Sequence, residues 1–480
     1  MNTYRQHIGG EWVDAADGGT WDVLNPATEE VVRAVPYGSA VDCERAIDAA
    51  AAAFPAWAAR TPYERGAVLK RAADLIRASL DDLARTTVLE SGKPLIQARG
   101  EWAVSADLLE WFAEEGKRAY GRIVPSRTQS KRLMVLKQPL GVVGVITAWN
   151  FPVYNIARAG AAALAAGCTL VVRPSEYTPM TAMEFVRLLV EGGTPSGVVN
   201  LVNGAPGPMG QVMLARPDCA KVHFTGSVRV GKLLMDGASK TVTRLSLELG
   251  GNAPVLVFPD VDLAQLAAGA TAAKFRNGGQ VCISPQRFLV ARKAVPEFVD
   301  RVAQSVSALR VGAGLDPDTQ VGPLINAQQR DRVEALVGSA RTSGAHVHTG
   351  GRRPAHLDKG YFYEPTVVAD VTPSTPLYHE EIFGPVLPVT AFDDIDEAIA
   401  LANDTRYGLA AYVWTNNLTA ALRTAERLQF GMVGVNEWTP QSIEAPFVGW
   451  KESGLGREAG AEGLEEYLET KLVAIGGMPS

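Results

Sequence analysis

From residue 141 onward, short apolar runs alternate with helix-like segments, and this alternation constrains the fold more than any other feature of the sequence. The runs "GVVGVITAW" and "TLVVRP" have the length and β-branched content of buried strands, and the Ala-rich "NIARAGAAALAAG" between them is typical of a helix. Strands joined by helices in this way run parallel and need cover on both faces of their sheet. The pattern therefore predicts an α/β fold.

A second series of the same kind begins near Asn252, with "APVLVF", "RFLVARK", "VLPVTAF" and "GLAAYVW" as its strands. Two successive series predict two parallel-sheet α/β domains. The segment 122–138 and the C-terminal "EEYLETKLVAIGG" alternate more like exposed strands, whose unpaired edges usually find a partner chain. We therefore expect a small β arm beside the two domains.

Composition narrows the class of protein. The chain has 480 residues, 47% hydrophobic and 20% charged, and its net charge of -6 gives no basic footprint for nucleic acid. Its first residues are polar and lack the apolar core of a signal peptide. The longest apolar stretch, residues 159–172, is too short to span a bilayer. We expect a cytoplasmic protein that binds neither nucleic acid nor membrane.

The chain has four cysteines, and Cys282 has the most unusual surroundings, "RNGGQVCISPQR". Four scattered cysteines in a long cytosolic chain do not form a disulfide framework. No CxxC pair exists, so a zinc site is not expected and we predict no metal. For Cys282, two interpretations remain at this point, a spacer or a nucleophile.

Three further stretches carry candidate functional residues. Asn150 in "AWNFP" follows an apolar strand and could face a crevice. In "FTGSVRVG", Gly226, Ser227 and Gly231 suit a phosphate at a helix N-terminus, and Glu248 lies in the apolar "LELGGN". Each also has a purely structural interpretation: a helix cap, an ordinary turn and a paired buried carboxylate. The GxGxxG fingerprint is missing, so these residues alone leave the function open.

Taken together, in their order and spacing, these stretches resemble the aldehyde dehydrogenase superfamily over nearly the whole chain. The motifs are "NPATEE", "LESGKPL", "AWNFP", "ALAAGCTLVVRPSEYTP", "FTGSVRVG", "LELGGN", "NGGQVC", "EEIFGPV", "GLAAYVW" and "PFVGWKESGLGRE". The C-terminal "GLEEYLETKLVAIG" looks like the succinate-semialdehyde branch. The resemblance implies an NAD-binding domain (1–118 and 140–250), a catalytic domain (251–450) and an oligomerisation arm (119–139 and 464–480) that builds a homodimer or homotetramer.

The resemblance also implies catalytic roles. Cys282 is the nucleophile that forms a thiohemiacetal and then a thioester, with Gly278 and Gly279 leaving room for cofactor and substrate. The Asn150 side-chain amide holds the oxyanion together with the Cys282 backbone N–H. Glu248 activates the hydrolytic water, with a pKa that its apolar surroundings should raise. Glu458 is a possible second carboxylate, because Ala159 stands where the family often has a lysine linked to proton relay.

The implied cofactor is NAD. The cofactor-binding positions carried over from the family are Ile146, Thr147, Trp149, Arg173, Glu176, Gly226, Ser227, Gly231, Leu249, Glu381 and Phe383. Glu176 would accept the adenine-ribose hydroxyls and repel a 2′-phosphate, which favours NAD. Arg173 replaces a family lysine and keeps NADP possible.

The implied substrate rests on two arginines. Arg158 and Arg276 coincide with the carboxylate-binding arginines of succinate-semialdehyde dehydrogenases, and Gln441 stands where these have a small serine. We predict a short semialdehyde such as succinate semialdehyde. Arg158 alone also matches lactaldehyde dehydrogenases, and either arginine could instead pair with an acidic neighbour. The rival classes are a catalytically inert binding protein and a CoA-acylating enzyme, which an intact Glu248 disfavours.

Overall fold

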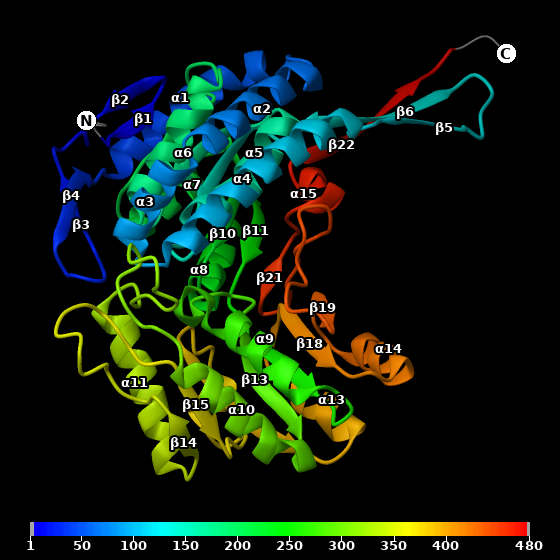
Figure 1. Ribbon diagram of the computed structural model, residues 1–480. Coiled ribbons are helices and arrows are strands. Elements are labelled where there is room, and N and C mark those ends of the chain that lie inside the picture. Colours follow the sequence, from blue (N-terminus) through cyan, green and yellow to red (C-terminus); the bar gives the residue numbers. More distant parts are fainter. Residues whose placement is uncertain (1–3, 478–480) are drawn as a thin grey trace.

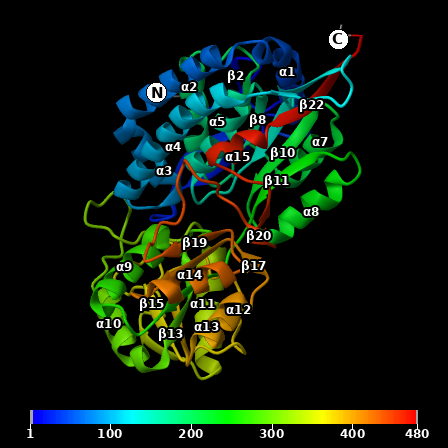
Figure 2. The same cartoon turned by 90° about the vertical axis from the view of Figure 1, so that its right-hand side faces the viewer.

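The computed structural model describes residues 4–477 and contains two large sheets, one above the other in Figures 1 and 2. The first sheet has eight strands, in the spatial order β2 (Glu11–Val13), β1 (Gln6–Ile8), β9 (Val199–Leu201), β8 (Thr169–Arg173), β7 (Val142–Ile146), β10 (Cys219–Thr225), β11 (Arg244–Glu248) and β21 (Gly454–Leu455). The five strands from β9 to β11 are parallel, and β1 and β21 join them antiparallel. The parallel sheet predicted from the sequence is confirmed.

Helices cover both faces of this sheet because its strands are apolar on both sides. In β7, Val143 and Val145 join one core, and Val142 and Ile146 join another on the opposite face. The first face carries α5 (Pro152–Ala166) and α6 (Pro179–Glu191), with α2 (Pro62–Ala78), α3 (Leu80–Ser91) and α4 (Leu95–Glu115) packed against them. The second face carries α1 (Ala40–Ala58), α7 (Pro206–Ala215) and α8 (Val228–Ala238).

The second sheet has seven strands and the same layered plan. Their order is β14 (His346–Thr349), β15 (Thr366–Ala369), β16 (Val386–Phe392), β13 (Pro285–Ala291), β12 (Ala253–Val257), β18 (Ala410–Trp414) and β19 (Met432–Val435). All neighbours are parallel except β14 and β15. One face packs against α9 (Leu263–Phe275) and α10 (Val295–Ser307). The other packs against α11 (Ala327–Thr342), α12 (Pro376–His379) and α13 (Ile395–Asn403), and α14 (Leu418–Arg427) lies beside β18 and β19.

The exposed strands expected from the sequence form a third, three-stranded antiparallel sheet. Its order is β22 (Leu468–Ile475), β6 (Arg132–Pro139) and β5 (Arg122–Val124). This sheet projects from the body of the molecule (Figure 1). Its apolar Ile123 and Leu472 are 77% and 62% exposed. Residues 478–480 of the expected arm lie outside the described residues.

The last part of the chain returns from the second sheet to the first. It runs through β20 (Trp450–Lys451), which pairs with β17 (Tyr407–Gly408), then β21, and then α15 (Gly460–Glu465), which packs against α4 and α5. Near the N-terminus, β3 (Thr20–Leu24) and β4 (Val31–Pro36) form a hairpin. Within residues 4–477, no helix combines the length and apolar character needed to cross a membrane.

Candidate active site

The predicted catalytic residues meet where the two parallel sheets face each other. Asn150 follows β7 and Glu248 ends β11, so both lie at the carboxyl edge of the first sheet. Cys282 lies in the loop between α9 and β13, at the opposing edge of the second sheet. All three line one cavity of about 390 Å³. A crevice at the carboxyl ends of parallel strands is the usual ligand site of such sheets.

The loop before Cys282 is a tight left-handed bend. Asn277, Gly278 and Gly279 have φ values of 51°, 60° and 73°. A Cβ on Gly279 would lie 2.1 Å from the backbone oxygen of Gly384, so this glycine lets the loop contact the "EEIFGP" segment. Gly279 therefore has a packing role that the sequence did not indicate, and the expected role of Gly278 and Gly279 in leaving room for ligands stays a prediction.

Cys282 is half-buried, and burial raises the pKa of its thiol to about 12, against the opposing effect of Arg158. At neutral pH the thiol is therefore protonated in the free protein and needs a base to become a nucleophile. The other cysteines, Cys43, Cys168 and Cys219, are fully buried. Cys282 is the only cysteine of the described chain that is partly exposed, and it borders a cavity.

Glu248 is a buried carboxylate without a partner. Its side chain is 3% exposed, and neither oxygen has a hydrogen-bond partner among the described residues. Burial, together with the charge of Glu458, raises its pKa well above the ordinary value. The alternative of a paired structural carboxylate therefore does not hold. A buried, unpaired acid with a raised pKa beside a cysteine is typical of a general base.

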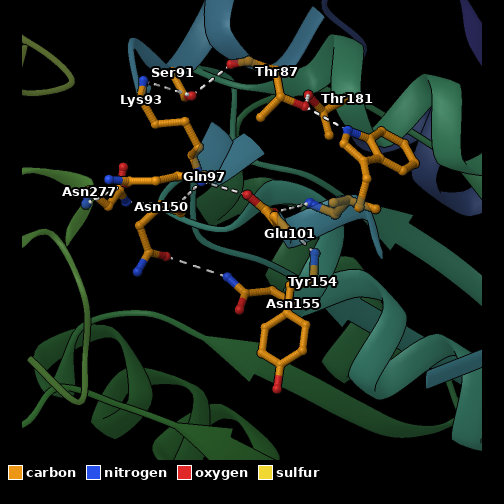
Figure 3. A network of polar contacts seen from close by, with 12 residues as sticks. Thr87, Ser91, Lys93, Gln97, Glu101, Asn150, Tyr154, Asn155, Thr181 and Asn277 are labelled. Atoms are coloured by element: carbon orange, nitrogen blue, oxygen red, sulfur yellow. Dashed lines mark hydrogen bonds and ion pairs between the residues drawn. The ribbon is translucent and has the colours of Figure 1, made fainter. Parts of the chain in front are cut away.

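Asn150 is held at several atoms (Figure 3). Its side-chain amide donates to the Gln280 carbonyl at 3.1 Å, close to Cys282 in the chain, and its side-chain oxygen accepts from Asn155 at 3.4 Å. Its backbone carbonyl accepts from Lys93 at 2.8 Å and from Asn277 at 3.0 Å. The amide is thus fixed beside the cysteine loop, where a developing oxyanion needs a donor.

Arg158 and Glu458 form a buried ion pair. Arg158 Nη1 lies 2.6 Å from Glu458 Oε2, and His223 Nε2 lies 2.9 Å from Glu458 Oε1. Burial alone would raise the pKa of Glu458, but Arg158 and His223 outweigh it and hold the pKa below its ordinary value. The sequence left open whether Arg158 pairs with an acidic residue of the protein, and the structure shows that it pairs with Glu458. His223 was missed, because "KVHFTGS" indicated only a strand.

A second cavity, of about 410 Å³, is also lined by Cys282. Its lining includes Arg158, Arg276 and Gln441, as well as Lys93 and Glu101, which the sequence analysis did not single out. Lys93 pairs with Glu101 at 2.5 Å, just as Arg158 pairs with Glu458.

Arg276 is the exception among the three cations of this cavity. Within residues 4–477 it has no carboxylate partner, and its guanidinium carbon lies 5.5 Å from the centre of the Phe151 ring. A partly buried guanidinium without an anion is unfavourable, and an anionic ligand would relieve that cost.

The predicted cofactor residues divide into two groups. Those that line the first cavity are Trp149, Gly226, Ser227, Leu249, Glu381 and Phe383. Ile146 and Thr147 are buried and do not line it, and a Cβ on Gly231 would lie 2.8 Å from the Leu249 side chain.

The residues at this cavity suit a nucleotide. Ser227 caps α8, which leaves backbone N–H groups of the first turn beside Gly226, an arrangement that binds phosphate. Glu381 accepts a hydrogen bond from Gly251 N at 3.0 Å, and burial raises its pKa to about 7. Further away, Arg173 is paired with Glu176 at 2.7 Å and also donates to the Gly204 carbonyl at 2.9 Å.

The comparisons with known proteins agree with this geometry. The sequence model described as "Aldehyde dehydrogenase family" matches residues 12–473. The chain belongs to the aldehyde dehydrogenase family. It is an oxidoreductase that acts on aldehydes, and the alternative of an inert protein has no support.

Two of the curated relatives show that the similarity extends over nearly the full length of both chains. Succinate-semialdehyde dehydrogenase [NADP(+)] GabD of Escherichia coli (strain K12) is 44% identical over 99% of this chain and 98% of that protein. A glutarate-semialdehyde dehydrogenase of Pseudomonas aeruginosa is 43% identical over 98% of this chain and 97% of that protein.

Among solved structures, succinate-semialdehyde dehydrogenase from Burkholderia pseudomallei has a TM-score of 0.97, with 44% identity over 98% of both chains. Betaine aldehyde dehydrogenase from Staphylococcus aureus, solved with NAD+, has a TM-score of 0.97 and 38% identity, over 99% of this chain and 95% of that one. The similarity therefore covers the whole dehydrogenase fold. In the described part of this chain, no group of three or more His, Cys, Asp or Glu side chains could hold a metal ion.

Proposed function

We propose that this aldehyde dehydrogenase oxidises a short aldehyde that carries a carboxylate, such as succinate semialdehyde, to the acid with NAD(P). The observation that carries the proposal is the unpaired Arg276 in the cavity beside Cys282. One uncompensated positive charge selects a substrate with one negative charge. The names of the relatives support a semialdehyde.

The rival substrates fit less well. A lactaldehyde held by Arg158 alone is disfavoured, because Glu458 already neutralises Arg158 at 2.6 Å. A relative named 3-sulfolactaldehyde dehydrogenase is 43% identical and indicates that a sulfonate, also singly charged, is the closest alternative anion.

In the proposed mechanism, Glu248 accepts the Cys282 proton, directly or through water, and the sulfur adds to the aldehyde carbon. The Asn150 side-chain amide and the Cys282 backbone N–H donate to the oxygen that becomes negative. When bound in the first cavity, the nicotinamide would supply the hydride acceptor that oxidation of the Cys282 thiohemiacetal to the thioester requires. After Glu248 has released the Cys282 proton to solvent, its carboxylate takes a proton from water as the water attacks the thioester carbon, and the Cys282 sulfur leaves as the acid is released.

For the cofactor, we propose NAD in preference to NADP. Gly226 and Ser227 would hold the diphosphate, Glu381 and Phe383 the nicotinamide ribose, and Glu176 the adenine ribose. Glu176 carries a negative charge that opposes a 2′-phosphate, while its partner Arg173 is already engaged by Glu176 and Gly204. Relatives of both kinds exist, one named for NADP(+) and one solved with NAD+.

We further propose the division of labour expected from the sequence: cofactor binding by 1–118 and 140–250, catalysis by 251–450, and assembly by 119–139 and 464–480. The projecting sheet β5–β6–β22 exposes apolar side chains and strand edges, which a second copy would cover in a homodimer or homotetramer. Light scattering should give a dimer or tetramer mass, and a concentration-independent monomer would contradict this. A cytoplasmic location stays a prediction.

The substrate test measures reduced cofactor by its absorbance. We expect kcat/KM for succinate semialdehyde to exceed that for butanal by about 30-fold or more, with lactaldehyde and benzaldehyde also poor. Adding CoA should not accelerate turnover, because Glu248 activates water. Equal rates for butanal and the semialdehyde would remove the carboxylate-binding role, and dependence on CoA would favour the acylating alternative.

A further inference from the structure

Lys93 and Glu101 form a second buried ion pair, close to Asn150. Lys93 lies between α3 and α4, and Glu101 lies on α4. Their side chains are each 1% exposed, and Lys93 Nζ lies 2.5 Å from Glu101 Oε2 (Figure 3). A buried ion pair adds little to the stability of a protein core, because the cost of desolvating both charges offsets their attraction. The other contacts of the two side chains give a better reason for their presence.

Glu101 caps the helix that follows Asn150. Its Oε1 accepts hydrogen bonds from the backbone N–H groups of Val153 at 2.9 Å and Tyr154 at 3.2 Å, in the first turn of α5. The residue at the usual capping position, Phe151, has no side chain that can accept these bonds. A carboxylate at this end also interacts favourably with the helix dipole. Glu101 therefore fixes the start of α5, which begins two residues after Asn150.

Lys93 extends this attachment to Asn150 itself. Its ammonium donates to the Asn150 carbonyl at 2.8 Å, and Asn277 from the cysteine loop donates to the same oxygen at 3.0 Å. The backbone N–H of Asn277 in turn donates to Gln97 at 2.8 Å, one turn of α4 before Glu101. The Asn150 carbonyl therefore accepts hydrogen bonds from two parts of the molecule, from Lys93 beside the helices of the first sheet and from Asn277 in the Cys282 loop.

We propose that Lys93 and Glu101 are positioning residues that set the side-chain amide of Asn150 for oxyanion binding. The proposal rests on the proposed role of Asn150. Lys93 acts on the backbone oxygen of that residue and Glu101 on the helix that follows it, so their effect on the reaction passes through Asn150. Loss of this hold should slow formation of the thiohemiacetal more than it weakens substrate or cofactor binding.

The test combines substitutions of Lys93 with Asn150→Ala. Lys93→Met removes the donor. Lys93→Met with Glu101→Gln also avoids a buried unpaired carboxylate, while the amide oxygen of the substituted side chain can still accept the hydrogen bonds that cap α5. Removing an oxyanion donor outright costs about 100- to 1000-fold in kcat, so misplacing it should cost about 10-fold or more. We expect this loss in the single-turnover rate of cofactor reduction, with the Kd for NAD and the KM changed less than about 3-fold.

The decisive question is whether the Lys93 substitutions lower the reduction rate by the same factor in the wild type and in the Asn150→Ala variant. In an Asn150→Ala background the Lys93 substitutions should cost less than about 3-fold further, because the group they position is gone. Arg65→Met is a control: Arg65 is also buried, donates to the Ala165 carbonyl at 3.0 Å and lines neither cavity. It should lower the melting temperature without changing the reduction rate.

Each outcome tests a different claim. A reduction rate in Asn150→Ala equal to wild type would refute the oxyanion role of Asn150. A slow Asn150→Ala combined with a full, multiplicative loss from the Lys93 substitutions would overturn the positioning role alone. If the double variant Lys93→Met/Glu101→Gln unfolds at the wild-type temperature and reduces cofactor at the wild-type rate, the pair has no part in catalysis.

Discussion

Substitution of Arg276 by alanine tests the substrate proposal most directly. Arg276 lines the cavity beside Cys282 and has no carboxylate partner in the described chain, so its removal leaves no protein charge unpaired. Truncating one partner of a buried charged hydrogen bond costs about 2–5 kcal/mol. Because Arg276 is only half-buried, the lower end applies, and about 2 kcal/mol corresponds to roughly 30-fold in kcat/KM.

The assay compares succinate semialdehyde with butanal in wild type, Arg276→Ala and Arg276→Lys. The loss should be about 30-fold for the semialdehyde and near unity for butanal, and lysine should restore only part of it because it lacks the planar fork. Arg158→Ala is a poor comparison, because it would leave the buried Glu458 carboxylate without its cationic partner. Arg158→Met with Glu458→Gln removes that pair together and is the matched control.

Two results would refute the reasoning. If Arg276→Ala lowers kcat/KM equally for both aldehydes, Arg276 supports the loop and does not recognise the carboxylate. If the loss of selectivity appears only when Arg158 and Glu458 are replaced, the carboxylate binds at Arg158 in spite of its ion pair, and the unpaired charge is not the determinant.

Two further predictions concern the proposed base and the cofactor. Because burial and Glu458 raise the pKa of Glu248, its basic form is still becoming more populated at pH values where an ordinary carboxyl is already ionised, so kcat should keep rising with pH above that range. Glu248→Gln should give one burst of reduced cofactor and then stall, and steady turnover by this variant would exclude the base role. Glu176→Gln should raise kcat/KM for NADP relative to NAD by about tenfold or more, because a like charge facing the 2′-phosphate is removed, and an unchanged ratio would show that Glu176 does not discriminate.

The fold was predictable because its strands are apolar on both faces. Every residue of β7 and of β8 is buried, so each appears in the sequence as a short, mainly apolar run that a helix follows. Cys282, Asn150 and Glu248 were predicted from motifs whose order matches the family, and the structure brings the three to one cavity. Their individual roles stay predictions until variants are measured.

The ion pairs of the site were not predictable from local sequence. Arg158 and Glu458 are 300 residues apart, and a lone charged residue in a sequence does not indicate which distant charge it will meet. Lys93 and Glu101 are close in sequence, but Lys93 precedes α4 and Glu101 lies within it, so their pairing does not follow from helix geometry alone. Nothing in "LESGKPL" indicates that the lysine donates to Asn150. In both cases the tertiary fold decides which charge is neutralised.

Glu458 links the choice of substrate to the strength of the base. Its carboxylate neutralises Arg158, so the charge that the second cavity offers to a substrate is that of Arg276. The same negative charge raises the pKa of Glu248, whereas Arg158 lowers it. As the second carboxylate of a proton relay, Glu458 would have to accept protons, yet Arg158 and His223 hold its pKa below the ordinary value and favour the ionised form. The contacts therefore favour an electrostatic role, in which Glu458 stays charged while Glu248 exchanges the proton.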